Sequence, residues 1–160
     1  MNKIRNIILH IPHSSANIPI KEGYVVSDFM LQAELNLLTD WFSDELFDYP
    51  TLKVIAPFSR IFCDVERFED DSIEIMAKYG MGMCYTHLDS GQLLRKIQPE
   101  LKTRIKNEFY DIHHQRLYET TNNLLKQHGK VTIVDCHSFS DIPFKRDLNQ
   151  ETPRPDFCIG

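Results

Sequence analysis

The alternation of short β-branched runs with long amphipathic segments most constrains the fold of this chain. Residues 4–11, 52–56 and 131–134 are short runs dominated by Ile, Val and Leu, with the length and composition of buried strands. Two long segments with helical spacing of apolar residues separate them. Strands that alternate with helices favour parallel pairing. The sequence therefore predicts an α/β fold, with a mostly parallel or mixed sheet flanked by helices.

Helix boundary signals mark both long segments. The first begins at Ser27, a good N-cap residue, and its apolar positions continue at helical spacing until Tyr49 and Pro50. The second runs from Pro99, at a typical first-turn position, to Gly129, at a typical C-cap. We expect one continuous helix in each segment.

Three further segments complete the expected secondary structure. Residues 61–65 resemble another strand, residues 66–92 are acidic and then Gly/Met-rich and should be mostly loop, and residues 156–159 resemble the start of a strand. With 160 residues, the chain has the length of one domain, which we assign to residues 1–160.

Composition narrows the class of protein. Apolar residues make up 42% and charged residues 26%, as in ordinary globular proteins. The net charge is −5 and the basic residues are dispersed, which argues against a nucleic-acid partner. No apolar run reaches membrane-spanning length, and the N-terminus lacks a leader pattern. The four cysteines form no regular framework, so reduced thiols and a cytoplasmic location are expected.

Two histidines follow predicted strands directly. His13 follows the first strand, and His137 follows the strand in VTIVDCHSFS. Ligands of parallel sheets bind at the carboxyl ends of the strands, where these two side chains could share a metal ion. Asp40 is the best third ligand, because a carboxylate within the apolar stretch LLTDWF needs a partner. The alternative is two hydrogen-bonded strand-end histidines, with Asp40 on the solvated side of its helix.

Two other features have simpler interpretations. His113 falls near the apolar stripe of the second helix and is expected to be a core or boundary histidine. Cys136 precedes His137, but adjacent strand residues point to opposite faces, which argues against a thiol nucleophile paired with that histidine.

Five motifs give the chain a family resemblance. HIPHSSANIP, LLTDWFSDELF, FSRIFCDVERF, YDIHHQRLYE and VTIVDCHSFS follow the order and rough separations found in the N-formylglutamate amidohydrolase family. These enzymes release formate from N-formyl-L-glutamate in histidine degradation. The resemblance implies a phosphorylase/hydrolase-like fold similar to the zinc carboxypeptidases, with one zinc ion or another divalent metal. Carried over to this chain, the implied metal ligands are His13, Asp40 and His137. The family's acidic ligand lies on the helix after the first strand, so Asp40 is expected on a helix.

The resemblance also implies a substrate-binding set. Arg60 and Arg67 match the family's arginines, which suit a substrate with carboxylates, whereas Glu66 replaces the usual Asn. The alternative is that Arg67 pairs with acidic neighbours at the surface. The other expected substrate-binding residues are Ser14, Ser138 and His114.

The general base is not identified in this sequence. The family carries a comparable Glu well beyond the last motif, so we expect that the chain lacks its C-terminal part and has little or no amidase activity alone. Asp64 and Glu66 are better explained as partners of the arginines, and Asp135 as a residue that orients a metal ligand.

The predicted function is metal-dependent hydrolysis of a small N-acyl amino acid such as N-formyl-L-glutamate. One alternative is a zinc-dependent peptidase or cell-wall amidase, since the metal ligands do not choose the acyl group. The other is a non-catalytic metal-binding remnant that has lost its base. The sequence does not determine the oligomeric state.

Overall fold

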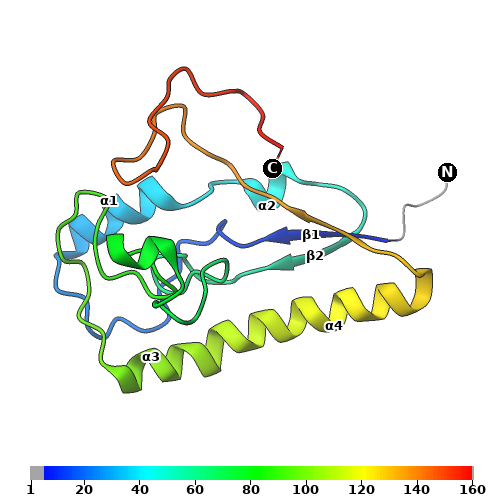
Figure 1. The fold of residues 1–160 in the computed structure, drawn as a ribbon, viewed down its shortest axis with the longest axis horizontal. Coiled ribbons are helices and arrows are strands. Elements are labelled where there is room, and N and C mark those ends of the chain that lie inside the picture. The colour runs from blue at the N-terminus through cyan, green and yellow to red at the C-terminus, as the bar shows by residue number, and fades with distance from the viewer. Residues whose placement is uncertain (1–5, 160) are drawn as a thin grey trace.

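The framework of the fold is a three-stranded parallel sheet, seen in a computed structural model that describes residues 6–159 (Figure 1). Its strands are β1 (Ile7–Ile11), β2 (Leu52–Ile55) and β3 (Thr132–Asp135), in the order β2-β1-β3. Ile8 of β1 lies opposite residues of both neighbouring strands. The α/β fold with a parallel sheet is confirmed. The start of the first predicted strand, at residues 4 and 5, lies outside the described residues.

The second long helix is also confirmed. It consists of α3 (Pro99–Ile105), one π-helical turn η2 (Lys106–Tyr110) and α4 (Asp111–His128), which follow one another without a break. Pro99 occupies the first turn, and Gly129 ends α4 in the left-handed region, with φ of 72°. α4 covers one face of the sheet, where Leu124 packs against residues of β1 and β2.

The prediction of one continuous helix from Ser27 to Tyr49 is wrong. Ser27 does cap α1 (Asp28–Leu38), but this helix stops before Thr39, and the short α2 (Ser43–Leu46) follows. The backbone N–H of Asp40 donates to the carbonyl of His13 at 3.0 Å, which ties this segment to the end of β1. Phe42 then adopts a left-handed conformation, with φ of 62°. Asp40 therefore lies in a loop and not on a helix.

The predicted strand at residues 61–65 is likewise wrong. The backbone N–H groups of Phe62 and Cys63 both donate to the carbonyl of Ser59, which closes a tight turn. Its apolar side chains are buried in two core clusters without any strand pairing. Burial therefore explains the apolar pattern of this segment. Residues 66–92 are mostly loop, as predicted, with one 3₁₀ helix η1 (Ile75–Tyr79).

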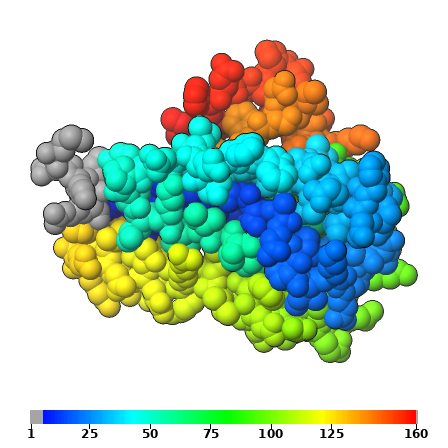
Figure 2. All heavy atoms as spheres, turned by 180° about the vertical axis from the view of Figure 1, so that it is seen from behind, coloured from blue at the N-terminus to red at the C-terminus, as the bar shows by residue number. Residues whose placement is uncertain are grey.

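The segment that follows β3, residues 136–159, wraps over the molecule on the side away from α4 (Figures 1 and 2). It forms no strand at residues 156–159, contrary to prediction, and Phe157 is 90% exposed. β3 is exposed along its length. Within residues 6–159, no helix combines the length and apolar character needed to cross a membrane.

Candidate metal centre

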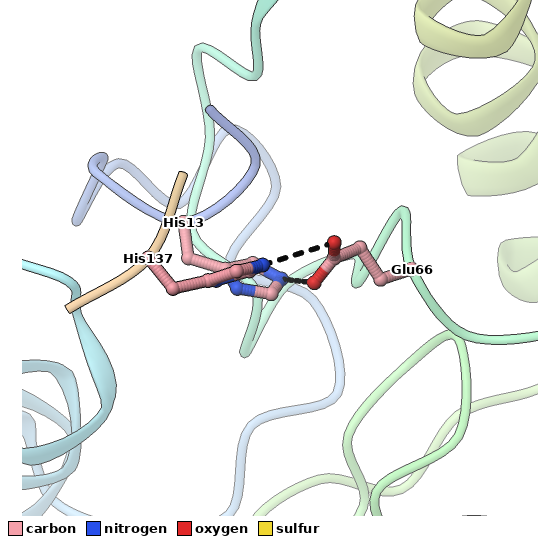
Figure 3. A group of neighbouring side chains, drawn as sticks. All are labelled: His13, Glu66 and His137. Carbon is pink, nitrogen blue, oxygen red and sulfur yellow. Dashed lines mark hydrogen bonds and ion pairs between the residues drawn. The ribbon is translucent and has the colours of Figure 1, made fainter. Parts of the chain in front are cut away.

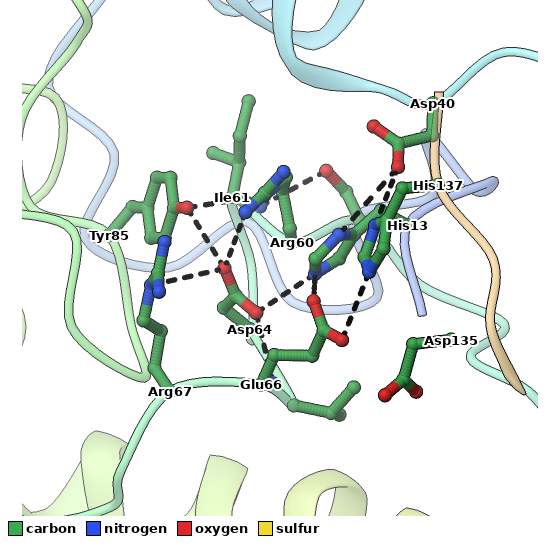
Figure 4. Close-up of polar contacts among 12 residues, drawn as sticks. His13, Asp40, Arg60, Ile61, Asp64, Glu66, Arg67, Tyr85, Asp135 and His137 are labelled. Carbon is green, nitrogen blue, oxygen red and sulfur yellow. Dashed lines mark hydrogen bonds and ion pairs between the residues drawn. The ribbon is translucent and has the colours of Figure 1, made fainter. Parts of the chain in front are cut away.

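The three residues predicted as metal ligands come together at the carboxyl edge of the sheet. His13 follows β1, Asp40 follows α1 and His137 follows β3. Asp40 Oδ2 lies 3.0 Å from His137 Nδ1 and 3.9 Å from His13 Nδ1. The two imidazole rings lie side by side, with centroids 5.2 Å apart (Figure 4). Crossover connections thus bring together groups that are far apart in the sequence.

The opposite ring nitrogens face a second pair of carboxylates. His13 Nε2 lies 2.9 Å from Asp64 Oδ1, and His137 Nε2 lies 3.1 Å from Glu66 Oε1. The other oxygen of Glu66 lies 3.5 Å from His13 Nε2, so this carboxylate faces both rings (Figure 3). Each histidine therefore has its Nδ1 directed toward Asp40 and its Nε2 toward a further acidic side chain.

Asp64 is the most heavily bonded of these carboxylates. Besides His13, it accepts hydrogen bonds from Arg60 Nη2 at 3.2 Å, the Tyr85 hydroxyl at 2.9 Å and the backbone N–H of Glu66 at 3.1 Å. Its side chain is fully buried. Burial alone would raise the pKa of Asp64, but the neighbouring His13 and Arg60 outweigh burial and hold it well below the usual range. Asp64 is therefore a fixed anion.

The same concentration of negative charge shifts the pKa values of the more exposed pair, His137 and Glu66. Hydrogen bonds from His137 to Asp40 and to Glu66 raise the pKa of this histidine to about 10 in the metal-free protein. Burial opposes ionisation of Glu66, but its contacts with His137 and His13 outweigh burial and lower its pKa. Three carboxylates around two imidazoles create a site that attracts a cation.

The side-chain arrangement fits a metal ion on the Nδ1 side of the rings. Asp64 accepts a hydrogen bond from His13 Nε2, which leaves Nδ1 as the lone-pair nitrogen. That Nδ1 is buried and has no hydrogen-bond partner among the described residues. Ligand atoms about 2.0 to 2.2 Å from a zinc ion lie roughly 3 to 4 Å apart, which matches the 3.9 Å gap to Asp40. Glu66 also lies within metal-ligand range of both histidines, but the His13 Nε2 that it faces is already bonded to Asp64.

The two predicted substrate-binding arginines differ in their contacts. Arg60 donates to Asp64 and, from Nε, to the Tyr85 hydroxyl at 3.2 Å. Arg67 Nε lies 3.8 Å from Asp64 and has no hydrogen-bond partner in the described chain. Asp64 is thus a partner of the arginines, as expected. Glu66 is not, since it faces the histidines instead.

The remaining predicted substrate-binding residues differ in whether they contact this site. Ser138 donates its backbone N–H to Asp40 at 3.3 Å, and Ser14 is half-buried next to His13 in the chain. His114 Nε2 instead lies 2.9 Å from the carbonyl of Val65. Its ring packs on that of Tyr110, one helical turn earlier.

Sequence reasoning missed the role of Asp64 and Glu66 as partners of the two histidines. It also missed a neighbouring group of three residues, in which His10 contacts both Asp135 and His113. For Asp64 a signal was available, because a carboxylate inside the apolar run IFCDV needs compensation just as Asp40 does. His10 is a single polar residue within the strand run IILHI, which gave a comparable but weaker signal.

Comparisons with known proteins bear on the family and the fold of the chain. No curated protein sequence matches the chain significantly. Among solved structures, the N-formylglutamate amidohydrolase from Ralstonia eutropha JMP134 has a similar fold, with a TM-score of 0.80 and 22% sequence identity. The match covers 94% of this chain and 59% of that protein. The model of the N-formylglutamate amidohydrolase family matches residues 5–160. The chain therefore belongs to the N-formylglutamate amidohydrolase family.

Proposed function

We propose that this chain carries the metal- and carboxylate-binding part of an amidohydrolase site for N-formyl-L-glutamate or a similar N-acyl amino acid. The ligands of the metal are His13, Asp40 and His137, and zinc is the expected ion. The observation that carries the proposal is the buried, unpartnered Nδ1 of His13, which faces Asp40 across 3.9 Å. A polar atom buried without a partner is costly and calls for a ligand.

The chemistry expected from zinc at this position is polarisation of the scissile carbonyl and acidification of water. The surrounding carboxylates orient the two histidines for metal binding. Asp64 accepts a hydrogen bond from Nε2 of His13 and leaves its Nδ1 free. Glu66 faces Nε2 of His137, so that a metal would take the place of the proton between its Nδ1 and Asp40. Asp40 faces both Nδ1 atoms and balances the charge of a divalent cation.

Arg67 is the residue of this chain best suited to bind a substrate carboxylate. A guanidinium pairs with a carboxylate through two parallel hydrogen bonds, and Arg67 Nε lacks a hydrogen-bond partner in the described residues. Arg60 is already engaged by Asp64 and Tyr85, so its main contribution is to fix Asp64. This division favours a small acidic substrate, since the interior of a neutral peptide offers no such carboxylate.

Calorimetric titration of the chain with N-formyl-L-glutamate, with and without zinc, tests the proposal. Binding should require zinc and weaken by about 2 to 5 kcal/mol in Arg67→Ala, since this change leaves a carboxylate without its partner. Arg104→Ala is the matched control, because Arg104 pairs only with Glu108 on an exposed helix face, and it should bind normally. Formate release by the zinc-loaded chain is the second measurement.

Equal affinity with and without zinc would contradict the proposed metal role. Equal affinity of the wild type and Arg67→Ala for N-formyl-L-glutamate would contradict the proposed substrate class. N-formylglycinamide, which has no carboxylate, gives the comparison within the ligand. Its binding should be weak in both proteins and unaffected by the Arg67 substitution.

A further inference from the structure

A second group of polar side chains lies on the other side of Glu66. His10 of β1 and Asp135 of β3 are direct neighbours in the parallel pairing of the two strands. His10 Nδ1 lies 2.5 Å from Asp135 Oδ1. Nitrogen and oxygen atoms of His10, Asp135 and Glu66 all lie within 4.8 Å of one another, the span of a metal site. The proposed centre of His13, Asp40 and His137 uses neither His10 nor Asp135.

We propose that His10, Glu66 and Asp135 form a second divalent-cation site next to the first, with Glu66 positioned between the two. One imidazole and two carboxylates are a nitrogen–oxygen ligand set of the kind that binds Zn²⁺ or Mn²⁺. Glu66 faces His13 and His137 at 3.5 and 3.1 Å and also reaches the His10–Asp135 pair. A carboxylate with two oxygens can serve both sides.

The far side of His10 is organised as a metal ligand requires. Its Nε2 lies 2.8 Å from Nε2 of His113, a residue of α4 that is itself buried. A metal-bound histidine usually has a partner on its other ring nitrogen, which fixes the ring and its tautomer. His113 fills that position here, so that His10 Nδ1 is the nitrogen directed toward the two carboxylates.

The charge balance also leaves room for a cation. Among the described residues, neither Asp135 nor Glu66 has a Lys or Arg within ion-pair distance, and their side-chain partners at that distance are histidines. The side chain of Asp135 is 55% exposed, so solvent ions have access to this position. The direct His10–Asp135 contact resembles the His137–Asp40 contact of the first centre, where an acid and a histidine hydrogen-bond in the absence of metal. Rotation of the exposed Asp135 side chain would open the pair for an ion.

The test is the number of Co²⁺ ions bound by the chain after treatment with a chelator, measured by calorimetry and by elemental analysis. The wild type should bind two ions, Asp135→Asn one and Asp40→Asn one. Asp141→Asn, which changes an exposed carboxylate of the tail outside both clusters, should bind two. Affinity for the second ion should fall at least about 10-fold in Asp135→Asn. Asp135 is exposed, so this variant should keep the wild-type circular dichroism spectrum.

The result separates this inference from the proposed function. One ion in the wild type, lost in Asp40→Asn and retained in Asp135→Asn, would overturn the second site and leave the first intact. Two ions in both the wild type and Asp135→Asn would also overturn it. Two ions in the wild type with selective loss of one in each variant supports both sites, and the visible absorption of Co²⁺ should then develop in two steps during titration.

Discussion

The inner and outer halves of the candidate centre share one chemistry but differ in their surroundings. In the inner half, the side chains of His13 and Asp64 are 1% and 0% exposed. In the outer half, those of His137 and Glu66 are 35% and 26% exposed. Both halves pair an imidazole Nε2 with a carboxylate. The difference places the inner pair within the folded core and the outer pair at a partly solvated surface.

The elements that carry the two halves explain this contrast. The inner half comes from the end of β1, the central strand, and from the turn at residues 59–64, whose apolar side chains belong to the core. In the outer half, His137 follows β3, an edge strand that stays exposed, and Glu66 lies just beyond the turn that carries Asp64. Substitutions in the inner half should therefore reduce the free energy of unfolding, and those in the outer half should reduce ligand binding.

The largest effect is expected for Asp64→Asn. The change leaves His13 and Arg60 next to a neutral amide in a fully buried position, and breaking a buried ion pair costs about 3 to 5 kcal/mol. Urea denaturation of the metal-free chain measures this loss. Asp48→Asn is the matched control, because its carboxylate is exposed and 3.8 Å from a surface lysine, and it should change stability by less than about 1 kcal/mol. Equal effects of the two substitutions would remove the distinction between the halves.

A smaller and different effect is expected for His137→Gln. Because its side chain is partly exposed and its ion pairs are screened by solvent, the loss of metal-free stability should be smaller than the loss of about 3 to 5 kcal/mol expected for Asp64→Asn. Zinc at 100 times its dissociation constant should stabilise the wild type by about 2.7 kcal/mol, and most of this gain should disappear in the variant. Denaturation with and without zinc compares the two quantities. A metal-free loss as large as that of Asp64→Asn would show that the outer half is also part of the core.

The smallest effect is expected for Ser27→Ala, at the start of α1. The Ser27 hydroxyl accepts a hydrogen bond from the backbone N–H of Met30, and loss of such a cap costs about 1 kcal/mol. Zinc affinity should remain unchanged, because Asp40 is held at the other end of α1 by its own bond to His13. Ser90→Ala, in an exposed turn, should leave stability within about 0.5 kcal/mol of the wild type. A drop in zinc affinity in Ser27→Ala would show that the helix, and not the loop, positions Asp40.

The sequence predicted the parallel sheet and the second long helix, because their signals are local. Strand runs with β-branched residues and the Pro99 and Gly129 boundaries do not depend on distant contacts. The break after α1 could not be predicted in this way. It depends on the backbone bond between Asp40 and His13, which are far apart along the chain, and helical spacing of apolar residues continues across it.

The candidate site was predictable in part for a similar reason. His13 and His137 follow strands whose carboxyl ends must meet in a parallel sheet, so their proximity follows from topology. The orientation of each ring does not. It is determined by Asp64, which lies in a turn that sequence patterns assigned to a strand, and by Glu66, at the start of the segment predicted to be loop. The strand assignment failed because buried turns and buried strands have the same apolar composition.

The central claim is that a metal ion is bound through the Nδ1 atoms of His13 and His137, together with Asp40. Crystals of the zinc-loaded chain, measured at the zinc absorption edge, test it most directly. The account predicts an anomalous peak about 2.0 to 2.2 Å from both Nδ1 atoms and from an oxygen of Asp40, with Asp64 and Glu66 still bonded to the Nε2 atoms. A peak on the Nε2 side of the rings, or none between the histidines and Asp40, would contradict it.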